Sequence, residues 1–496
     1  MKRTLTFSVF ALFALQSSLS FAQDTPPPEG VPPTPDAAPT PVAAPPPAIE
    51  AAPTAIAAPP ATPASPPAVG NAPLESGPQP VQGKWNTTFY GFAEFDAIHD
   101  STQPGLTTIN DSQGNGALAR PGTPQANNGQ TLFGARNSRI GFKLTAPVED
   151  GIKASAVLEM DFLGNQPTST ASQAALIGNP TFRVRHVAIK IEDPIVDLLL
   201  GQYWQLFGWQ SMFHPNTVEI QGVPGQVYSR APEARLSKTV HAGAFNLDLA
   251  LAAARPASRN SEEPDGQAGV KLTFNDWKGL HTAGGAGTAV DGLSLGVSGV
   301  ARRFVVPSLV GAGHNKRKGW GLSLDALIPV IPAAMDKRAN ALTLTGSFVT
   351  GTGISDLYTG LSGGVGFPSP PNPAGVMPAP TYSPDIDNGM VTFDAQGQLH
   401  TIDWRSFIVG VQYYLPPSGK LWVSGNYSVM KSNNAASYGL DPSKVFDKSW
   451  WADANVFYDL TSAVRLGAEY AYFHQTYGDG AEAKNTRLQF SGFYLF

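Results

Sequence analysis

The sequence has no cysteine, and only 14% of its 496 residues are charged. Without cysteine the chain can form no disulfide framework, no thiolate metal site and no thiol redox centre. Globular chains average about 25% charged residues. The low charged fraction is not offset by a high apolar fraction, because apolar residues make up only 42% of the chain. Glycine (51) and proline (45) are abundant instead. A net charge of −5 argues against a nucleic-acid-binding function.

The first 22 residues have the features of a secretory signal peptide. Lys2 and Arg3 are followed by an apolar stretch at 5–15 and by Ser-Phe-Ala at 20–22, which has the form of a cleavage site. We therefore expect cleavage after Ala22 and export of the mature chain. An N-terminal membrane anchor is the alternative, which the short apolar stretch disfavours. No later stretch approaches the ~18 apolar residues of a transmembrane helix.

Residues 23–82 form a second segment of unusual composition. They contain 20 Pro, 14 Ala and no Lys or Arg. Such a segment buries too little apolar surface to offset the entropy of ordering, so we expect a disordered arm, partly polyproline II. At about 3.1 Å per residue it would reach roughly 190 Å when fully extended. We expect a spacer in the periplasm, and a tether toward peptidoglycan or another partner is a further hypothesis.

From residue 83 onward, apolar and polar residues alternate with a period of two. In 88–96 one face holds Phe89, Gly91, Ala93 and Phe95. About sixteen such segments follow, many near the 9–11 residues of a tilted membrane strand. Short turns such as 148–151 and 416–419 alternate with long loops such as 99–136 and 351–400. This layout predicts an all-β fold for residues 83–496: a transmembrane antiparallel β-barrel of about 16 strands in the outer membrane of a Gram-negative bacterium.

A soluble β-sandwich is the alternative fold, since its strands would also alternate. It would expose many charges on one face, whereas here Ser, Thr, Asn and Gly dominate the polar face. One strand breaks the pattern, because alternation would place Arg183 and Arg185 on the same face of the strand as the apolar Val187. Either a β-bulge near His186 resets the register, or the assignment of faces fails in this strand.

The last residues of the chain form an aromatic stripe. One face of the final segment holds Leu488, Phe490, Gly492, Tyr494 and Phe496. This resembles the terminal strand by which bacterial outer-membrane proteins are recognised by the barrel-assembly machinery, which we therefore expect as a partner. Outer-membrane lipid and lipopolysaccharide are the other partners expected of such a barrel.

Residues 137–239 resemble the DcaP-like porins, a group within the trimeric 16-stranded porins. The resemblance is carried by NSRIG at 137–141, LEMDF at 158–162, RVRH at 183–186, LGQYW at 200–204, HPNTVE at 214–219 and SRAPEAR at 229–235. It implies a homotrimer, a third loop near 207–228 folded inward to narrow the lumen, and passage of small anions such as dicarboxylates. The family carries a helical N-terminal extension, from which the Pro/Ala arm departs.

Ion preference depends on where charges lie, because 31 basic and 33 acidic residues of the barrel nearly balance. We expect the pore-lining basic residues to be Arg139, Lys143, Arg183, Arg185, Arg230, Arg235, Lys238, Arg465 and Arg487. The expected pore-lining acidic residues are Glu94, Asp96, Glu159, Asp161 and Glu219. We hypothesise that the basic residues of this set between 139 and 238 form one basic wall, which faces Glu219. Alternatively, these cations pair with the wall's own carboxylates and only hold it together.

Enzyme and metal motifs give little support to a catalytic function. Gly-Leu-Ser-Leu-Gly at 292–296 matches a hydrolase pattern but lies inside an alternating strand, so we expect Ser294 to line the lumen. Asp385–Gly389 begins like a calcium loop but lacks the Glu at position twelve, which leaves a bound Ca²⁺ open. We expect no cofactor and no enzymatic activity. The sequence favours a diffusion channel for small hydrophilic solutes; the alternative is a closed barrel acting as an adhesin, surface-binding protein or envelope anchor.

Overall fold

Alternation of apolar and polar residues produces long antiparallel strands, each with one face toward lipid and one toward the interior. The computed structural model describes residues 85–102, 118–164, 181–218, 223–258, 261–282, 287–308, 313–334, 337–359, 387–394, 396–438 and 441–496. The signal peptide and the Pro/Ala arm expected at 1–22 and 23–82 lie outside these residues, as do Asp385 and Ile386, the first two residues of the calcium-like segment.

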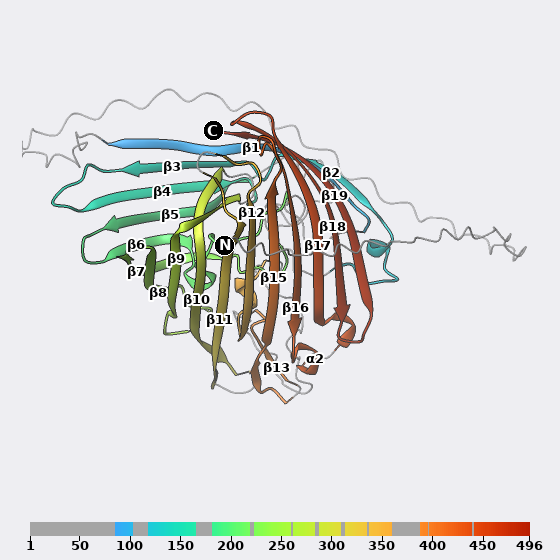
Figure 1. Cartoon of the computed structure of the whole chain (residues 1–496). Coiled ribbons are helices and arrows are strands. Elements are labelled where there is room, and N and C mark those ends of the chain that lie inside the picture. The colour runs from blue at the N-terminus through green and yellow to red at the C-terminus, as the bar shows by residue number, and fades with distance from the viewer. Residues whose placement is uncertain are drawn as a thin grey trace, which may run out of the picture. The chain divides into compact units, whose positions relative to one another are not determined.

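The described residues form one closed barrel (Figure 1). Its strands are β1 (Asn86–Asp100), β2 (Gln130–Gly134), β3 (Arg139–Thr145), β4 (Lys153–Asp161), β5 (Arg183–Glu192), β6 (Asp197–Trp204), β7 (Arg230–Ala242), β8 (Phe245–Ala254), β9 (Asp265–Thr282), β10 (Thr288–Pro307), β11 (His314–Ile331), β12 (Leu342–Thr352), β15 (Asp403–Tyr414), β16 (Leu421–Ser432), β17 (Phe446–Asp459), β18 (Val464–Tyr477) and β19 (Glu482–Leu495). Because β2 and β3 share one place beside β1, the wall has sixteen positions in the described chain. The predicted all-β, 16-stranded barrel is confirmed.

The first and last strands close the barrel. β1 pairs with β19 from Phe92 opposite Leu495 to Asp100 opposite Arg487. The backbone N–H of Phe496 donates to the carbonyl of Gly91 at 3.1 Å, and Gly91 donates in return at 2.9 Å. Closure leaves no strand edge unpaired, which is what a sheet in hydrocarbon requires.

Long and short connections lie at opposite ends of the barrel. We call the end with 101–129, 162–182, 205–229 and 353–402 the long-loop rim, and the other end the short-turn rim. Smaller elements in the long connections are η1 (Pro124–Ala126), η2 (Phe207–Trp209), η3 (Ser355–Leu357), β13 (Val391–Phe393), β14 (Leu399–Thr401), α2 (Ala435–Tyr438) and η4 (Pro442–Lys444). No helix in the described part of the chain is both long and apolar enough to cross a membrane.

Two loops are joined by an ion pair at the long-loop rim. Arg120 donates to both carboxylate oxygens of Asp479 and, at 2.9 Å, to the carbonyl of Ser443. The hydrogen bonds from Arg120 lower the pKa of Asp479 below its usual range. Since both groups are exposed, we expect this link to weaken in salt.

The outer surface carries an aromatic girdle near each rim. At the short-turn rim, the Phe89 ring lies 4.9 Å from that of Phe496. At the long-loop rim, Trp450 and Tyr472 lie 5.0 Å apart. From Trp450 to the exposed Tyr458 the strand rises about 27 Å at 3.4 Å per residue. This matches the ~25 Å apolar band of a transmembrane barrel once strand tilt is considered, and it excludes the soluble sandwich.

Part of the barrel interior is packed with aromatic side chains. The rings of Trp422 and Phe457 stack with centres 4.0 Å apart, and Tyr414 lies 5.4 Å from Trp422 on the other side. All three side chains are fully buried, and the Arg465 guanidinium lies 5.2 Å from the centre of the Trp422 ring. This stack fills part of the interior near the short-turn rim, on the inner face of β15–β18.

Replacing Trp422 with alanine is expected to lower the free energy of unfolding by about 3–5 kcal/mol, because the stack would be left with a cavity. The measurement is urea unfolding in detergent micelles, followed by heat-modifiable gel mobility. Leu421→Ala is the matched control, since its side chain faces outward on the same strand. A loss for Trp422→Ala no larger than that of the control would contradict the packing role.

Candidate functional site

Loop three, residues 205–229, folds into the barrel from the end of β6. The backbone N–H of Phe207 donates to Gln267 Oε1 at 2.8 Å, and that of Gly208 donates to Ser298 Oγ at 2.7 Å. The N–H of Val218 donates to Asn455 Oδ1 at 2.9 Å and to Glu469 Oε2 at 3.0 Å. Because these acceptors lie on β9, β10, β17 and β18, the loop crosses the interior to the far wall. The inward-folded loop predicted from the resemblance is confirmed.

The return limb of loop three is held by the connection 353–402. Tyr228 N–H donates to the Leu357 carbonyl at 2.9 Å, and Thr359 N–H donates to the Gln226 carbonyl at 2.7 Å. Arg302 on β10 fixes this connection by donating to Asp356 Oδ2 at 2.7 Å and to the Gly353 carbonyl at 2.8 Å. Arg302 was not among the predicted pore-lining residues, although its even spacing from Ser294 places it on the inner face.

The interior behind loop three is filled by an apolar cluster. Phe207 and Val227 of the loop pack there with buried residues of β10, β12 and β15–β17. Ser294 is also fully buried on the inner face, with its Oγ 3.0 Å from Thr273 Oγ1. This half of the interior is therefore packed, and loop three meets the wall formed by β1 and β3–β7 through His214 and Tyr228, whose rings lie 5.3 and 4.8 Å from that of Trp204.

Four arginines gather on that wall around two carboxylates. Arg185 Nε lies 2.7 Å from Glu159 Oε1, and its Nη1 lies 3.1 Å from Asp161 Oδ2. Arg183 binds Asp161 through two hydrogen bonds of 3.0 and 2.7 Å. Arg139 Nε lies 3.7 Å from Glu159. We call Arg139, Arg183, Arg185 and Arg230, together with Glu159 and Asp161, the arginine cluster.

A β-bulge in β5 brings these arginines to the inner face. The register of β4 against β5 shifts so that Glu159 lies opposite His186 and Met160 opposite Val184. Arg185 and His186 are both buried, whereas Val184 and Val187 are exposed. The bulge expected near His186 is therefore confirmed, and it explains why the simple alternation failed in this strand.

The cluster carries more positive than negative charge. Three of its arginines pair with Glu159 or Asp161, so the alternative that these cations stabilise the wall is correct for them in part. Arg230 makes no ion pair with any carboxylate in the part of the chain that the structure describes. Its guanidinium instead lies 4.8 Å from the centre of the Trp204 ring and 5.4 Å from that of Tyr228. Four guanidinium groups thus face two carboxylates.

Aromatic side chains from the wall and from loop three pack against the cluster. The Trp204 ring centre lies 5.4 Å from that of His186, 5.3 Å from His214 and 4.8 Å from Tyr228. Tyr90 donates its hydroxyl to Glu159 Oε2 at 3.0 Å. Sequence reasoning gave these rings no role, although four of them lie in or directly beside the motifs of the family resemblance. Their packing limits the conformations of the guanidinium groups.

Gly201 permits the close approach of β6 to β5 beside this aromatic group. Its φ is +128°, and a Cβ there would lie 2.2 Å from the Val187 carbonyl oxygen. We expect Gly201→Ala to lower the free energy of unfolding by about 1–3 kcal/mol, measured by urea unfolding in micelles. In Gly492→Ala the new Cβ would meet only Leu466 Cδ2, at 3.8 Å, so this control should unfold nearly as the parent does. Equal unfolding midpoints for the two variants would refute the strain at Gly201.

Lys143 and Arg235 lie on the short-turn side of the cluster. Both line a cavity of about 400 Å³ on the inner wall, together with Tyr90, Lys190, Asp197 and Tyr203. Arg235 pairs with Glu233 at 2.5 Å and donates to the Trp204 carbonyl. These cations extend the basic surface from the arginine cluster toward the short-turn rim.

Other residues predicted to line the pore lie elsewhere on the inner face. Arg487 binds Asp100 through hydrogen bonds of 2.9 and 3.1 Å on β19 and β1. Asp96 accepts from Asn137 at 2.9 Å and from Gln489 at 3.1 Å, and the buried Glu94 lies on the same face of β1. Arg465 pairs with Asp459 at 2.7 Å beside Trp422. None of these residues contacts the arginine cluster through a described ion pair.

Lys238 was placed wrongly by the sequence analysis. It lies opposite Leu249 in the β7–β8 register, on the same outer row as the exposed Leu236 and Val240. Its ammonium group reaches the Pro194 carbonyl at the short-turn rim. Lys238 is three residues from Arg235, and an odd separation in a strand puts two side chains on opposite faces. Glu219, the predicted acidic partner of the basic wall, lies outside the described residues.

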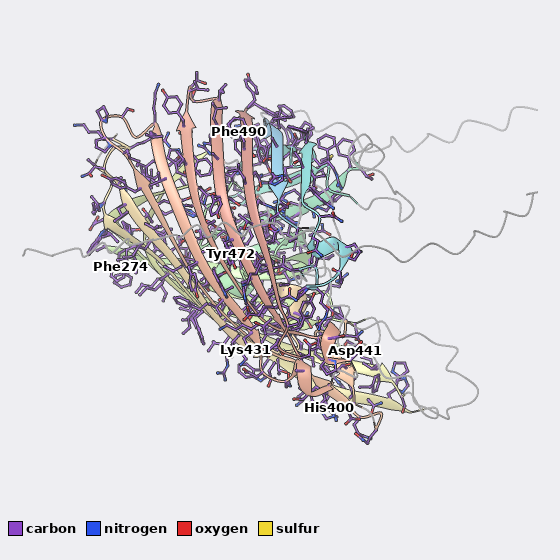
Figure 2. The ribbon with its side chains drawn as sticks, turned by 90° about the vertical axis from the view of Figure 1, so that its right-hand side faces the viewer. Phe274, His400, Lys431, Asp441, Tyr472 and Phe490 are labelled. Carbon is purple, nitrogen blue, oxygen red and sulfur yellow. The ribbon has the colours of Figure 1, made fainter. Side chains whose placement is uncertain are left out.

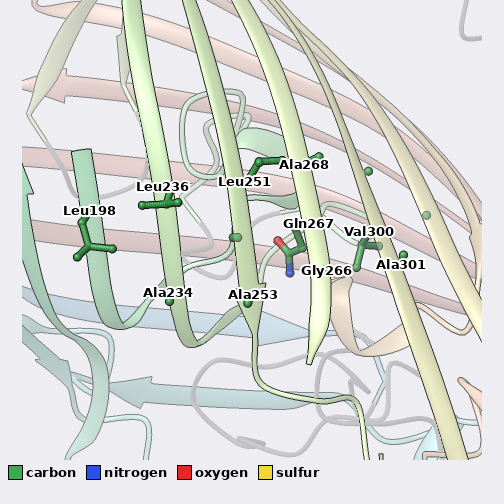
Figure 3. A pocket seen from close by; sticks show the side chains of 13 residues that line it. Leu198, Ala234, Leu236, Leu251, Ala253, Gly266, Gln267, Ala268, Val300 and Ala301 are labelled. Carbon is green, nitrogen blue, oxygen red and sulfur yellow. The ribbon is translucent and has the colours of Figure 1, made fainter. Parts of the chain in front are cut away.

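A groove of about 810 Å³ lies on the outer wall and is separate from the channel (Figure 3). Its exposed leucines, Leu236 and Leu251, belong to the outward rows of β7 and β8. Small residues give the groove its depth: Ala234, Ala253, Gly266, Ala268, Gly299, Ala301 and Gly321. The groove therefore faces the lipid side of the barrel.

Solved structures share this architecture. The outer membrane channel DcaP of Acinetobacter baumannii superposes with a TM-score of 0.58 at 17% identity, covering 83% of this chain and 97% of that one. This chain has the fold of an outer-membrane porin. The fold expected from the resemblance to the DcaP-like porins is thus confirmed.

More distant similarities cover the same share of the chain. An anion-selective porin from Comamonas acidovorans gives a TM-score of 0.47 at 12% identity, covering 83% of this chain and all of that one. OprB of Pseudomonas putida gives 0.43 at 11% identity, with 83% and 94% covered. No protein-family model and no curated protein sequence matches the chain.

Proposed function

We propose that this barrel is a porin through which small hydrophilic solutes diffuse passively across the outer membrane, with a preference for anions such as dicarboxylates. One observation carries the preference: four guanidinium groups gather around two carboxylates on the wall that loop three contacts through His214 and Tyr228. An excess of fixed positive charge at a constriction attracts anions and repels cations. The similarity to the DcaP channel supports the fold on which this proposal rests.

The geometry suits transient binding of carboxylates. The planar fork of arginine matches a carboxylate with two parallel hydrogen bonds, and Arg230 has no described carboxylate partner to compete with the solute. The remaining arginines are partly neutralised, so the site attracts an anion without a full fourfold charge to hold it. Conduction requires this balance, because a solute that binds too tightly does not leave. Lys143 and Arg235 would then receive the anion on the short-turn side.

The test is single-channel recording of the full-length protein in planar lipid bilayers. We expect stepwise channel openings, which should occur in groups of three if the protein is a homotrimer. A dicarboxylate such as succinate should block the chloride current in a concentration-dependent manner. A barrel that conducts no ions would instead support the adhesin, surface-binding or anchor alternative. Open channels that succinate does not block would refute the dicarboxylate preference while leaving the diffusion channel intact.

The remaining proposals concern assembly and position. We propose that the long-loop rim faces the cell exterior, that the chain forms a homotrimer and that no enzymatic step takes place. The outward aromatic row of β19, ending at Phe496, supports recognition by the barrel-assembly machinery. We propose a periplasmic position for the arm at 23–82. Deleting residues 24–80 should reduce the amount of protein that remains with purified peptidoglycan, and an unchanged amount would remove the tether hypothesis.

A further inference from the structure

Three cations form a row on the outer wall near the long-loop rim. Arg405, Lys431 and Lys448 are exposed and project outward from β15, β16 and β17. In the sheet register Arg405 lies directly opposite Lys431, which lies directly opposite Lys448. Figure 2 shows Lys431 toward the end of the barrel where His400 and Asp441 lie. These residues lie on the outer face of β15–β17, whereas the arginine cluster lies on the inner face of β3–β7.

The described part of the chain does not neutralise this row. Like charges directly opposite one another in a sheet, with Cβ atoms about 5 Å apart, destabilise it. None of the three cations forms an ion pair with a carboxylate in the described part of the chain. Asp403, two residues before Arg405, is not paired with it, and Glu482 is engaged by His474 at 3.4 Å and Lys484 at 3.7 Å. Such uncompensated repulsion indicates an anionic partner outside the chain.

The aromatic girdle places this row at the membrane interface. Trp450 follows Lys448 by two residues, about 7 Å along the strand. Its ring lies 5.0 Å from Tyr472 and 6.4 Å from Tyr427, and Phe407 is 49% exposed two residues beyond Arg405. Aromatic girdles mark the level at which acyl chains give way to head groups. The three cations therefore lie at head-group height, with apolar side chains on the membrane side.

We propose that Arg405, Lys431 and Lys448 bind the phosphate groups of a phosphorylated glycolipid in the outer leaflet. The Arg405 fork donates two hydrogen bonds to two oxygens of one phosphate, and the flexible lysines adjust to a second phosphate. The acyl chains would lie along Phe407, Val429 and Trp450. A row three strands wide suits a head group with more than one phosphate better than a single-phosphate lipid. This site depends on the outer-membrane location but not on conduction through the barrel.

The test compares two triple variants of the full-length protein extracted from outer membranes in mild detergent. Arg405→Gln/Lys431→Gln/Lys448→Gln removes the row. Lys278→Gln/Lys337→Gln/Lys420→Gln removes equal charge from exposed lysines toward the short-turn rim. Native mass spectrometry counts the lipopolysaccharide molecules that remain bound. The first variant should retain about tenfold less lipopolysaccharide than the parent, and the control should retain as much as the parent. Equal retention by the two variants would overturn the site.

Further binding experiments identify the ligand. The delipidated parent protein should bind micelles of bisphosphorylated lipid A, and this binding should fall about tenfold in the row variant. Micelles of dephosphorylated lipid A should bind the parent no better than they bind the row variant. If the parent bound phosphorylated and dephosphorylated micelles equally well, phosphate recognition would be overturned. Equal binding to phosphatidylglycerol vesicles, or displacement by millimolar inorganic phosphate, would overturn the assignment to a glycolipid. Heat-modifiable gel mobility equal to that of the parent shows that the row variant is folded, whether or not the barrel conducts.

Discussion

Replacing Arg139 and Arg230 together with glutamine is expected to reduce the anion preference of the reconstituted channel by at least about threefold. These two arginines are the least neutralised members of the cluster, because Arg139 lies 3.7 Å from Glu159 and Arg230 has no described ion pair. Arg183 and Arg185 would then be left with Glu159 and Asp161, so the positive excess would disappear. The readout is the permeability ratio of chloride to potassium from reversal potentials in planar bilayers.

Two controls separate charge from structure. Arg139→Lys with Arg230→Lys keeps both charges and should retain most of the ion preference, although it loses the bidentate geometry. Lys238→Gln removes a cation that lies on the outer wall and should leave the permeability ratio unchanged. An unchanged ratio in the double glutamine variant, with normal single-channel conductance, would contradict the role of the arginine cluster.

Removing the tip of loop three is expected to raise the single-channel conductance by about twofold or more and to weaken anion preference. Deletion of residues 211–224, with a short Gly-Ser link, removes the segment that reaches Asn455 and Glu469. It retains Phe207 and Val227, which belong to the apolar cluster behind the loop. A wider lumen passes more current, and it lets ions travel farther from the arginine cluster. The measurement is conductance in the same bilayer assay.

A milder pair of variants tests the anchor of the loop. Glu469→Gln keeps an oxygen that accepts from Val218 N–H and should conduct as the parent does. Glu469→Ala combined with Asn455→Ala removes both acceptors of that N–H and should produce noisier, larger openings. If neither the deletion nor the double alanine variant alters conductance, loop three does not form the constriction.

The alternation of apolar and polar residues was sufficient to predict the barrel, because every membrane strand needs an apolar outer face and a polar inner face. The same rule places Arg139, Lys143 and Asp161 on the inner wall without knowledge of the fold. It failed for Lys238, whose odd separation from Arg235 was overlooked, and it needed a bulge at Arg185 and His186 to account for β5. Local alternation thus predicts faces well where the register is regular.

The site required information that alternation does not contain. Arg230, Trp204 and His214 come together because loop three crosses the interior and returns, and the course of a loop is set by distant hydrogen bonds such as that of Val218 to Asn455. The neutralisation of Arg183 and Arg185 depends on their register against Glu159 and Asp161, which a one-residue shift changes. For the same reason, the repulsive row at Arg405, Lys431 and Lys448 is visible only once β15–β17 are aligned.

An excess of positive charge at the constriction is what makes us expect an anion preference. The most direct measurement is the reversal potential of the unmodified protein in a planar bilayer with a tenfold gradient of potassium chloride. We expect a potential whose sign corresponds to chloride being more permeant than potassium, and a smaller potential at high ionic strength because salt screens the arginines. A reversal potential of zero, or one that corresponds to potassium being more permeant, would contradict it.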